Sequence, residues 1–118
     1  MAQYAVLIYA DDSAHHPEAS PEDTESCDRH ADDLTGDGSM LVAFALTPRA
    51  MARSVRPDGV TDGPFVDARH IVAGFYVIEA PDLEAALAIA GTNPAISEGG
   101  GVEVRPVHSG GTVERPQP

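Results

Sequence analysis

Short apolar runs separated by turn residues predict four strands. Residues 3–9 form a run rich in Val, Ile, Leu and Tyr, and a run of this length is typical of a strand. Residues 40–46 and 71–80 are similar, and over 102–107 valines alternate with charged residues. Pro106 has no amide hydrogen to donate, so we expect this last strand at a sheet edge.

Two segments with helical spacing lie between these strands. Ser20 and Pro21 predict the start of the first helix, because Ser is a favourable N-cap and Pro fits the first helical position. Its apolar stripe is Cys27, Ala31 and Leu34, and residues 36–38 end it. Asp82 predicts the N-cap of a second helix, which Gly91 and then Asn93-Pro94 end. The apolar stripe of this helix is Leu83, Ala86, Leu87 and Ala90.

The segment between the second and third strands predicts a hairpin. Residues 49–61 contain a Pro-Asp-Gly turn, and a second Asp-Gly pair follows at 62–63. The order strand, helix, strand, hairpin, strand, helix, strand is the split βαβ plan of a ferredoxin-like α+β domain. We expect one domain over residues 1–108, and the composition of 109–118 predicts a disordered tail.

Both faces of the predicted sheet are apolar. Apolar residues occupy alternate and intervening positions along residues 4–9 and 72–78. Two helices can cover only one face of a four-stranded sheet, and soluble monomers rarely expose a large apolar patch. The sequence therefore predicts a homodimer in which a second copy covers the other face.

Charge narrows the range of partners. Nineteen Asp and Glu stand against seven basic residues, all of them Arg, and the net charge is −12. Such a surface repels phosphate, so we expect no nucleic-acid or membrane-surface binding, and no apolar run reaches the roughly 20 residues that a membrane span needs. One cysteine and an N-terminus without a basic signal-peptide region predict a cytoplasmic location.

Five motifs in order resemble a known family. They are Tyr-Ala-Val-Leu-Ile-Tyr at 4–9, Val-Thr-Asp-Gly-Pro-Phe at 60–65, Gly-Phe-Tyr-Val-Ile-Glu-Ala at 74–80, Asp-Leu-Glu-Ala-Ala at 82–86 and Val-Glu-Val-Arg-Pro-Val at 102–107. Together they resemble the DGPF-motif branch of the YCII-related proteins. The resemblance spans nearly the whole chain and implies a dimeric α+β barrel.

The resemblance also implies a cleft in which some members hold a His and Asp pair suited to proton transfer. His30 occupies the matching place in the first helix. The usual acid lies in an Asp-Pro-Tyr segment after the second helix, and here that segment is Asn93-Pro94-Ala95. The pair is therefore not carried over intact. The branch is often encoded beside alternative sigma factors, which implies a sigma factor as a possible protein partner.

His30 and Asp62 are the predicted catalytic residues. His30 borders the apolar stripe of its helix, where desolvation favours a neutral imidazole, and a carboxylate such as Asp62 could orient it. We expect Tyr4, Phe65 and Arg49 to bind the ligand, with Arg49 as an anchor for an anion. The alternative is structural for both residues. His30 is then a boundary histidine that bonds a carbonyl or Asp33. Asp62 bonds backbone amides in a turn while Phe65 anchors the loop in the core.

Other candidate sites are weaker. His15-His16 beside Asp11-Asp12 lacks the spacing of metal ligands, and Cys27 has acidic neighbours that disfavour a thiolate, so we expect neither metal nor cofactor. Two functions remain open. One is an enzyme that acts on a small aromatic or lactone-like metabolite by His acid–base chemistry. The other is a non-catalytic dimer that binds a ligand or a regulatory protein.

Overall fold

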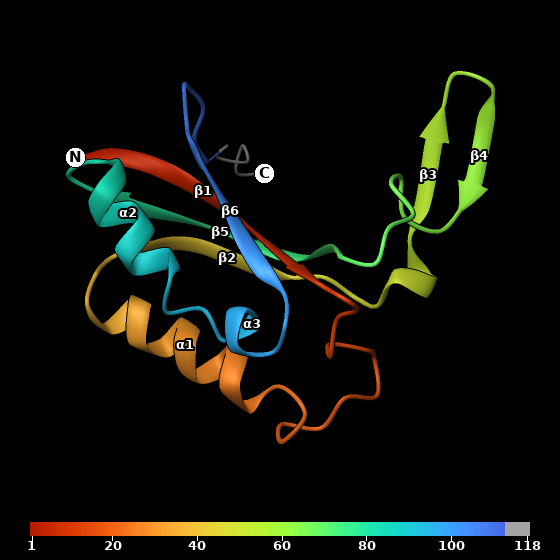
Figure 1. Ribbon diagram of the computed structural model, residues 1–118, viewed down its shortest axis with the longest axis horizontal. Helices are drawn as coiled ribbons and strands as arrows, with labels where there is room; N and C mark the ends of the chain where they lie inside the picture. The colour runs from red at the N-terminus through yellow and green to blue at the C-terminus, as the bar shows by residue number, and fades with distance from the viewer. Residues whose placement is uncertain (113–118) are drawn as a thin grey trace, which may run out of the picture.

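Four antiparallel strands form the main sheet in a computed structural model that describes residues 1–112 (Figure 1). In sheet order they are β2 (Met40–Ala45), β5 (Ile71–Ala80), β1 (Ala2–Ala10) and β6 (Gly101–Pro106). The long strands β1 and β5 pair along their whole lengths at the centre, and β6 lies at one edge. The four predicted strands and the edge position of the last are confirmed.

Three helices cover one face of this sheet, as Figure 1 shows. They are α1 (Glu25–Gly36), α2 (Leu83–Ala90) and the short α3 (Pro94–Ser97). With the strands they give a mixed α+β chain whose order and antiparallel sheet are consistent with a ferredoxin-like fold. Among the described residues no helix is long and apolar enough to cross a membrane.

The predicted hairpin forms a small sheet of its own. A 3₁₀ turn at Arg49–Met51 leads into β3 (Arg53–Arg56), which pairs only with β4 (Gly59–Asp62). In Figure 1 this hairpin stands away from the main sheet and from the helices. It is therefore attached to the domain through the segments at its base.

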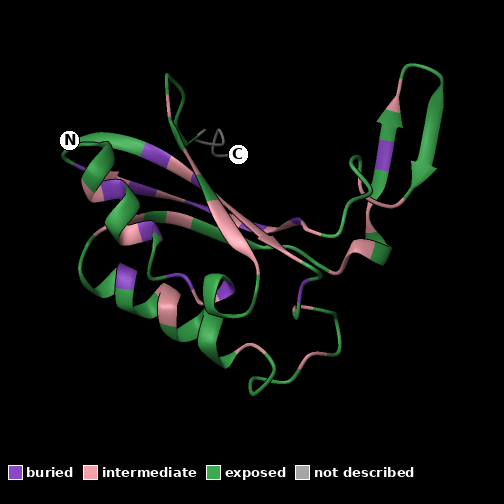
Figure 2. Ribbon diagram, in the orientation of Figure 1, coloured by how far each residue is buried: buried purple, intermediate pink, exposed green. Residues whose placement is uncertain are grey.

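The core lies between the main sheet and the helices. Figure 2 shows buried segments along β1 and β5. The cluster consists of Tyr4, Val6, Leu34, Tyr76, Ile78, Ala80, Ala86 and Ala90. Along β5 buried residues alternate with half-buried ones, as a sheet covered on one face requires.

The opposite face of the sheet has no cover within the described chain. Phe44 of β2 pairs in register with Phe75 of β5, and their ring centroids lie 5.6 Å apart. Phe44 is 56% exposed, whereas Phe75 and Val77 are half-buried. The sheet therefore has a second apolar face, as the sequence predicted.

Helix α1 begins later than the sequence indicated. Ser20 and Asp23 do exchange the bonds of a capping box, with Ser20 N donating to Asp23 Oδ2 at 2.9 Å and Asp23 N to Ser20 Oγ at 3.4 Å. They close an isolated turn, and the helix starts at Glu25. Residues 21–24 carry no apolar side chain that could hold a further helical turn against the sheet.

The inner face of α2 also differs from the prediction. Its buried residues are Ala86 and Ala90, whereas Leu83 and Leu87 are 43% and 46% exposed. Small side chains let the helix approach the sheet closely, so the leucines face outward. The expected tail begins after β6, and its residues 113–118 lie outside the described part of the chain.

Candidate functional site

Helix α1 places His30 next to the face of the sheet that the helices cover. The imidazole is half-buried and meets the Tyr76 ring edge to face, with centroids 5.9 Å apart and an interplanar angle of 75°. Both side chains line a cavity of about 280 Å³ between α1, α3 and the sheet. We call it the His30 cavity, and its other lining residues include Ile8, Met40, Asn93 and Ala95.

A hydrogen bond determines which ring nitrogen of His30 carries the proton. His30 Nε2 lies 2.8 Å from Thr92 Oγ1, and that hydroxyl donates its only proton to Ile89 O at 2.7 Å. Thr92 must therefore accept, so Nε2 carries the hydrogen. Burial lowers the pKa of His30 below 6.5, against a smaller opposing effect of Asp33. At neutral pH the ring is uncharged and Nδ1 holds the free lone pair.

Tyr76 brings a hydroxyl to the same cavity. Its oxygen is buried and has no hydrogen-bond partner among the described residues. Burial raises the pKa of Tyr76, and the nearby Asn93 side chain offsets this only in part. The phenol therefore keeps its proton at neutral pH, and this proton has no acceptor among the described residues.

In the described part of the chain, no carboxylate forms an ion pair or a hydrogen bond with His30. Asn93, at the position where the family resemblance implies an acid, is buried and caps α3, since its Oδ1 accepts from Ala95 N at 2.9 Å. Cys27 also lines the cavity, and its pKa is raised by burial and then by Glu98 and Asp28. It is therefore a thiol, and its reactivity is low.

Asp62 lies elsewhere. It ends β4 in the hairpin, is exposed, and forms an ion pair with Arg53 Nε at 3.2 Å. It lines neither the His30 cavity nor the shallow neighbouring hollow that also includes His30. Within one chain the structure does not bring the two predicted catalytic residues together.

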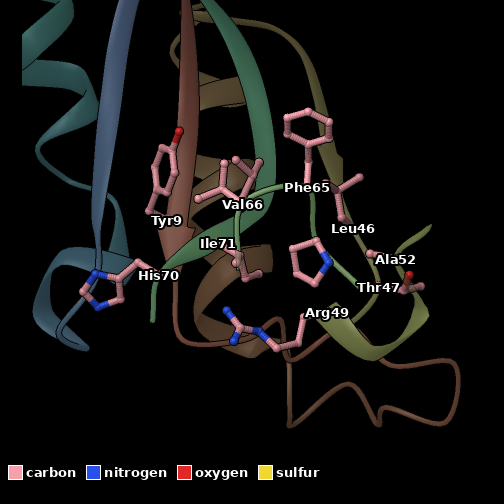
Figure 3. A pocket seen from close by; sticks show the side chains of 11 residues that line it. Tyr9, Leu46, Thr47, Arg49, Ala52, Phe65, Val66, His70 and Ile71 are labelled. Atoms are coloured by element: carbon pink, nitrogen blue, oxygen red, sulfur yellow. The ribbon is translucent and has the colours of Figure 1, made fainter. Parts of the chain in front are cut away.

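Two of the three predicted ligand-binding residues share a second cavity, shown in Figure 3. Arg49 and Phe65 line this space of about 570 Å³ at the base of the hairpin. Tyr4 does not belong to either cavity: it is 6% exposed and packs in the core. We call the second space the hairpin cavity.

The expected anchoring of Phe65 in the core is wrong for the single chain. Its side chain is 61% exposed, and its ring packs under the Arg56 guanidinium, 4.1 Å from the centroid. Backbone contacts hold the loop instead. Gly63 N donates to Ala52 O, and Ser54 Oγ donates to Gly63 O, both at 2.8 Å.

Sequence reasoning missed Tyr76 and Thr92 in the His30 cavity. One signal was available for Tyr76, because it carries the only side-chain hydroxyl in the apolar run 71–80. Thr92 gave none, since a single threonine after a helix is an ordinary C-terminal residue. Its contact with His30 joins residues 62 positions apart.

A comparison with known protein families matches a stretch of the chain that includes the lining residues of both cavities. The sequence profile of the YCII-related domain matches residues 2–109. The chain belongs to the YCII-related family. No curated protein matches it. The matched residues include every helix and strand that the structure describes in this YCII-related chain. Among residues 1–112, no group of three or more His, Cys, Asp or Glu is placed to hold a metal ion.

Proposed function

We propose that this YCII-related chain is an enzyme that binds a small aromatic or lactone-like molecule in the His30 cavity and uses His30 in acid–base chemistry. One observation carries the proposal: a neutral imidazole and a phenol that has no acceptor among the described residues line the same cavity. Buried and half-buried titratable groups beside a small cavity are the usual arrangement of a proton-transfer site.

His30 and Tyr76 have different roles in the proposed reaction. His30 Nδ1 accepts a proton from a water molecule or from a carbon beside a carbonyl, while Thr92 fixes the ring through Nε2. The Tyr76 hydroxyl donates to the carbonyl oxygen, where negative charge develops. Thr92 takes the orienting role that we predicted for Asp62.

The finer assignments belong to the same proposal. Val-Thr-Asp-Gly-Pro-Phe at 60–65 supports placing the chain in the DGPF-motif branch of the family. The open apolar face of the sheet supports a homodimer joined face to face. A cytoplasmic location stays a prediction.

The alternative is a non-catalytic dimer that binds a ligand or a regulatory protein such as a sigma factor. Asn93 favours it, because the amide has no charge and its oxygen is used to cap α3. The net charge of −12 suits a basic protein partner. The experiment below distinguishes the two.

Dihydrocoumarin, an aromatic lactone, is a suitable probe. We expect the chain to accelerate the hydrolysis of its lactone ring. In the His30→Gln variant the rate of this hydrolysis should be about a hundredfold or more lower. The Tyr76→Phe variant should also open the lactone more slowly. It should fold normally, because the substitution removes a buried hydroxyl that has no hydrogen-bond partner among the described residues. His108→Gln is the matched control, since His108 is exposed and bonds only Ser109.

Nuclear magnetic resonance separates binding from turnover. If dihydrocoumarin shifts the His30 ring signals but is not opened, the cavity binds without catalysis and the alternative replaces the enzyme. If the lactone neither shifts these signals nor reacts, aromatic lactones are excluded as ligands of the His30 cavity.

A further inference from the structure

The hairpin cavity is separate from the His30 cavity and differs from it in chemistry. In Figure 3, Phe65 lies at the top and Arg49 at the bottom, with Val66 and Ile71 between them and Tyr9 to the left. Its volume of about 570 Å³ falls in the ordinary range for small-molecule sites. The two cavities share no lining residue.

The walls of the hairpin cavity are mostly apolar. They come from the ends of β1 and β5, from the segment after β2, and from the loop that follows β4. The apolar lining residues are Tyr9, Leu46, Ala52, Pro64, Phe65, Val66, Ile71 and Val72. The polar groups come from Thr47, Arg49, His70 and the hydroxyl of Tyr9. An apolar space with few polar groups suits an organic ligand with one polar end.

Arg49 is the one permanent charge among the lining residues. Its Nη2 donates to the carbonyl oxygens of Ala68 and Arg69, at 2.5 and 3.4 Å, and its Nε has no partner in the described chain. Four other arginines form ion pairs with acidic side chains, namely Arg29, Arg53, Arg69 and Arg105. In a chain of net charge −12, no carboxylate within residues 1–112 forms an ion pair with the Arg49 guanidinium.

None of the lining residues is Asp or Glu, and the two acidic side chains that directly follow β1 are engaged with other groups. Asp11 Oδ1 lies 3.3 Å from Arg69 Nε and 3.2 Å from His70 Nε2. Asp12 Oδ1 accepts the backbone amides of Ser13 and Arg49, both at 2.8 Å. Neither carboxylate is among the groups that line the cavity. An incoming anion therefore meets a cation and apolar walls there.

We propose that the hairpin cavity binds a small organic carboxylate with an aromatic body, held by Arg49 through the carboxylate and by Tyr9, Phe65 and Val66 through the ring. Guanidinium and carboxylate form strong charge-assisted hydrogen bonds of matching planar geometry. The Phe65 wall is itself fixed, because Arg56 packs on its ring and donates to Phe65 O at 2.7 Å. This site is independent of the proposed chemistry at His30.

The first test uses 3-phenylpropionate and its neutral amide, 3-phenylpropanamide, on the unmodified full chain. Titration followed by nuclear magnetic resonance should show saturable shifts of the backbone amides of Val66, Ile71 and Val72 with the acid. The amide should bind about tenfold or more weakly, because it lacks the charge that Arg49 recognises. Equal binding of acid and amide would overturn the assignment of Arg49 as the anchor.

Variants then locate the contact. Arg49→Gln should weaken 3-phenylpropionate binding about tenfold or more, and Arg49→Lys should keep most of it. Arg53→Gln is the matched control: it removes an exposed arginine close by in the chain that does not line the cavity. Phe65→Ala should weaken the acid and the amide alike. His30→Gln should leave both unchanged, so failure here is distinguishable from failure at the His30 cavity.

Two results would remove the proposal. One is the absence of any shift at Val66, Ile71 and Val72 with 3-phenylpropionate. The other is a pattern of shifts that maps to His30 and Asn93 instead. If Arg49→Gln does not fold, the comparison of acid with amide on the unmodified chain still decides.

Discussion

His30 and Thr92 illustrate how a contact between two single residues fixes a protonation state. The threonine hydroxyl has one proton, and Ile89 O takes it, so the imidazole must present its N–H to Thr92. The same imidazole is partly withdrawn from water by Tyr76 and the sheet. Its tautomer and its charge are thus both determined before any ligand enters.

This arrangement predicts a pH dependence of stability. Burial lowers the pKa of His30 below its ordinary 6.5, so between the two values the unfolded chain binds more protons than the folded chain. The contribution to the free energy of unfolding is complete above pH 6.5 and is lost as pH falls through this range. Denaturant unfolding at a series of pH values measures this effect. As the pH falls, the free energy of unfolding should decrease less in His30→Gln than in the unmodified chain.

His108→Gln is the control for this experiment, because His108 is exposed after β6. It should lose stability on acidification as the unmodified chain does. Identical pH profiles of all three proteins would contradict the burial of the imidazole.

At the scale of elements, the connection from α3 to β6 depends on one close approach. Gly100 donates to Ala95 O at 2.8 Å, and a Cβ on Gly100 would lie 2.2 Å from the backbone oxygen of Tyr9. The glycine therefore lets the end of α3 pass against β1. In the sequence, residues 99–101 are three glycines with no sign of which one is required.

Gly100→Ala should lower the free energy of unfolding by roughly 1–3 kcal/mol, because the backbone must shift to make room. Gly101→Ala is the matched control, since a Cβ there meets nothing within 4 Å and its φ is not positive. We expect it to change stability by no more than about 0.5 kcal/mol. Denaturant unfolding of the two variants measures the difference, and equal losses would contradict the close contact.

The strands were predictable because each is a local apolar run bounded by turn residues. Helix ends were harder, because the same residue types serve different purposes. Asn93-Pro94 was interpreted as the end of α2, yet Asn93 also caps α3 and Pro94 is its first residue. Which alanines or leucines of α2 face the sheet depends on packing distance, and hydrophobic spacing alone does not encode that distance.

For the whole molecule, the open sheet face predicts association. Light scattering should give twice the mass of one chain, because the face that holds Phe44 and Phe75 is apolar and uncovered. Phe44→Glu should yield the monomer by placing a charge in this face. Leu83→Glu, on the outer side of α2, changes an equally apolar residue away from the face and should leave the dimer intact. A single-chain mass for the unmodified protein would refute the dimer.

The site was predictable only in part, because its members come together through the fold. His30 was identified from its place on a helix, and Arg49 and Phe65 were named as ligand residues that do share a cavity. Asp62 was paired with His30 because both suit the chemistry. The hairpin instead holds Asp62 against Arg53, and no local pattern reports how far a hairpin stands from a helix.

The separate hairpin sheet also bears on how such a chain can diversify. Within the described residues, strands β3 and β4 form a sheet separate from the main one, so their length and residues can change without altering a strand pairing of the main sheet. The loop that follows them forms one wall of the hairpin cavity, whereas the His30 cavity is built from α1, α3 and the main sheet. Mutation can therefore adjust the molecules accepted at one cavity while the proton-handling residues of the other stay as they are.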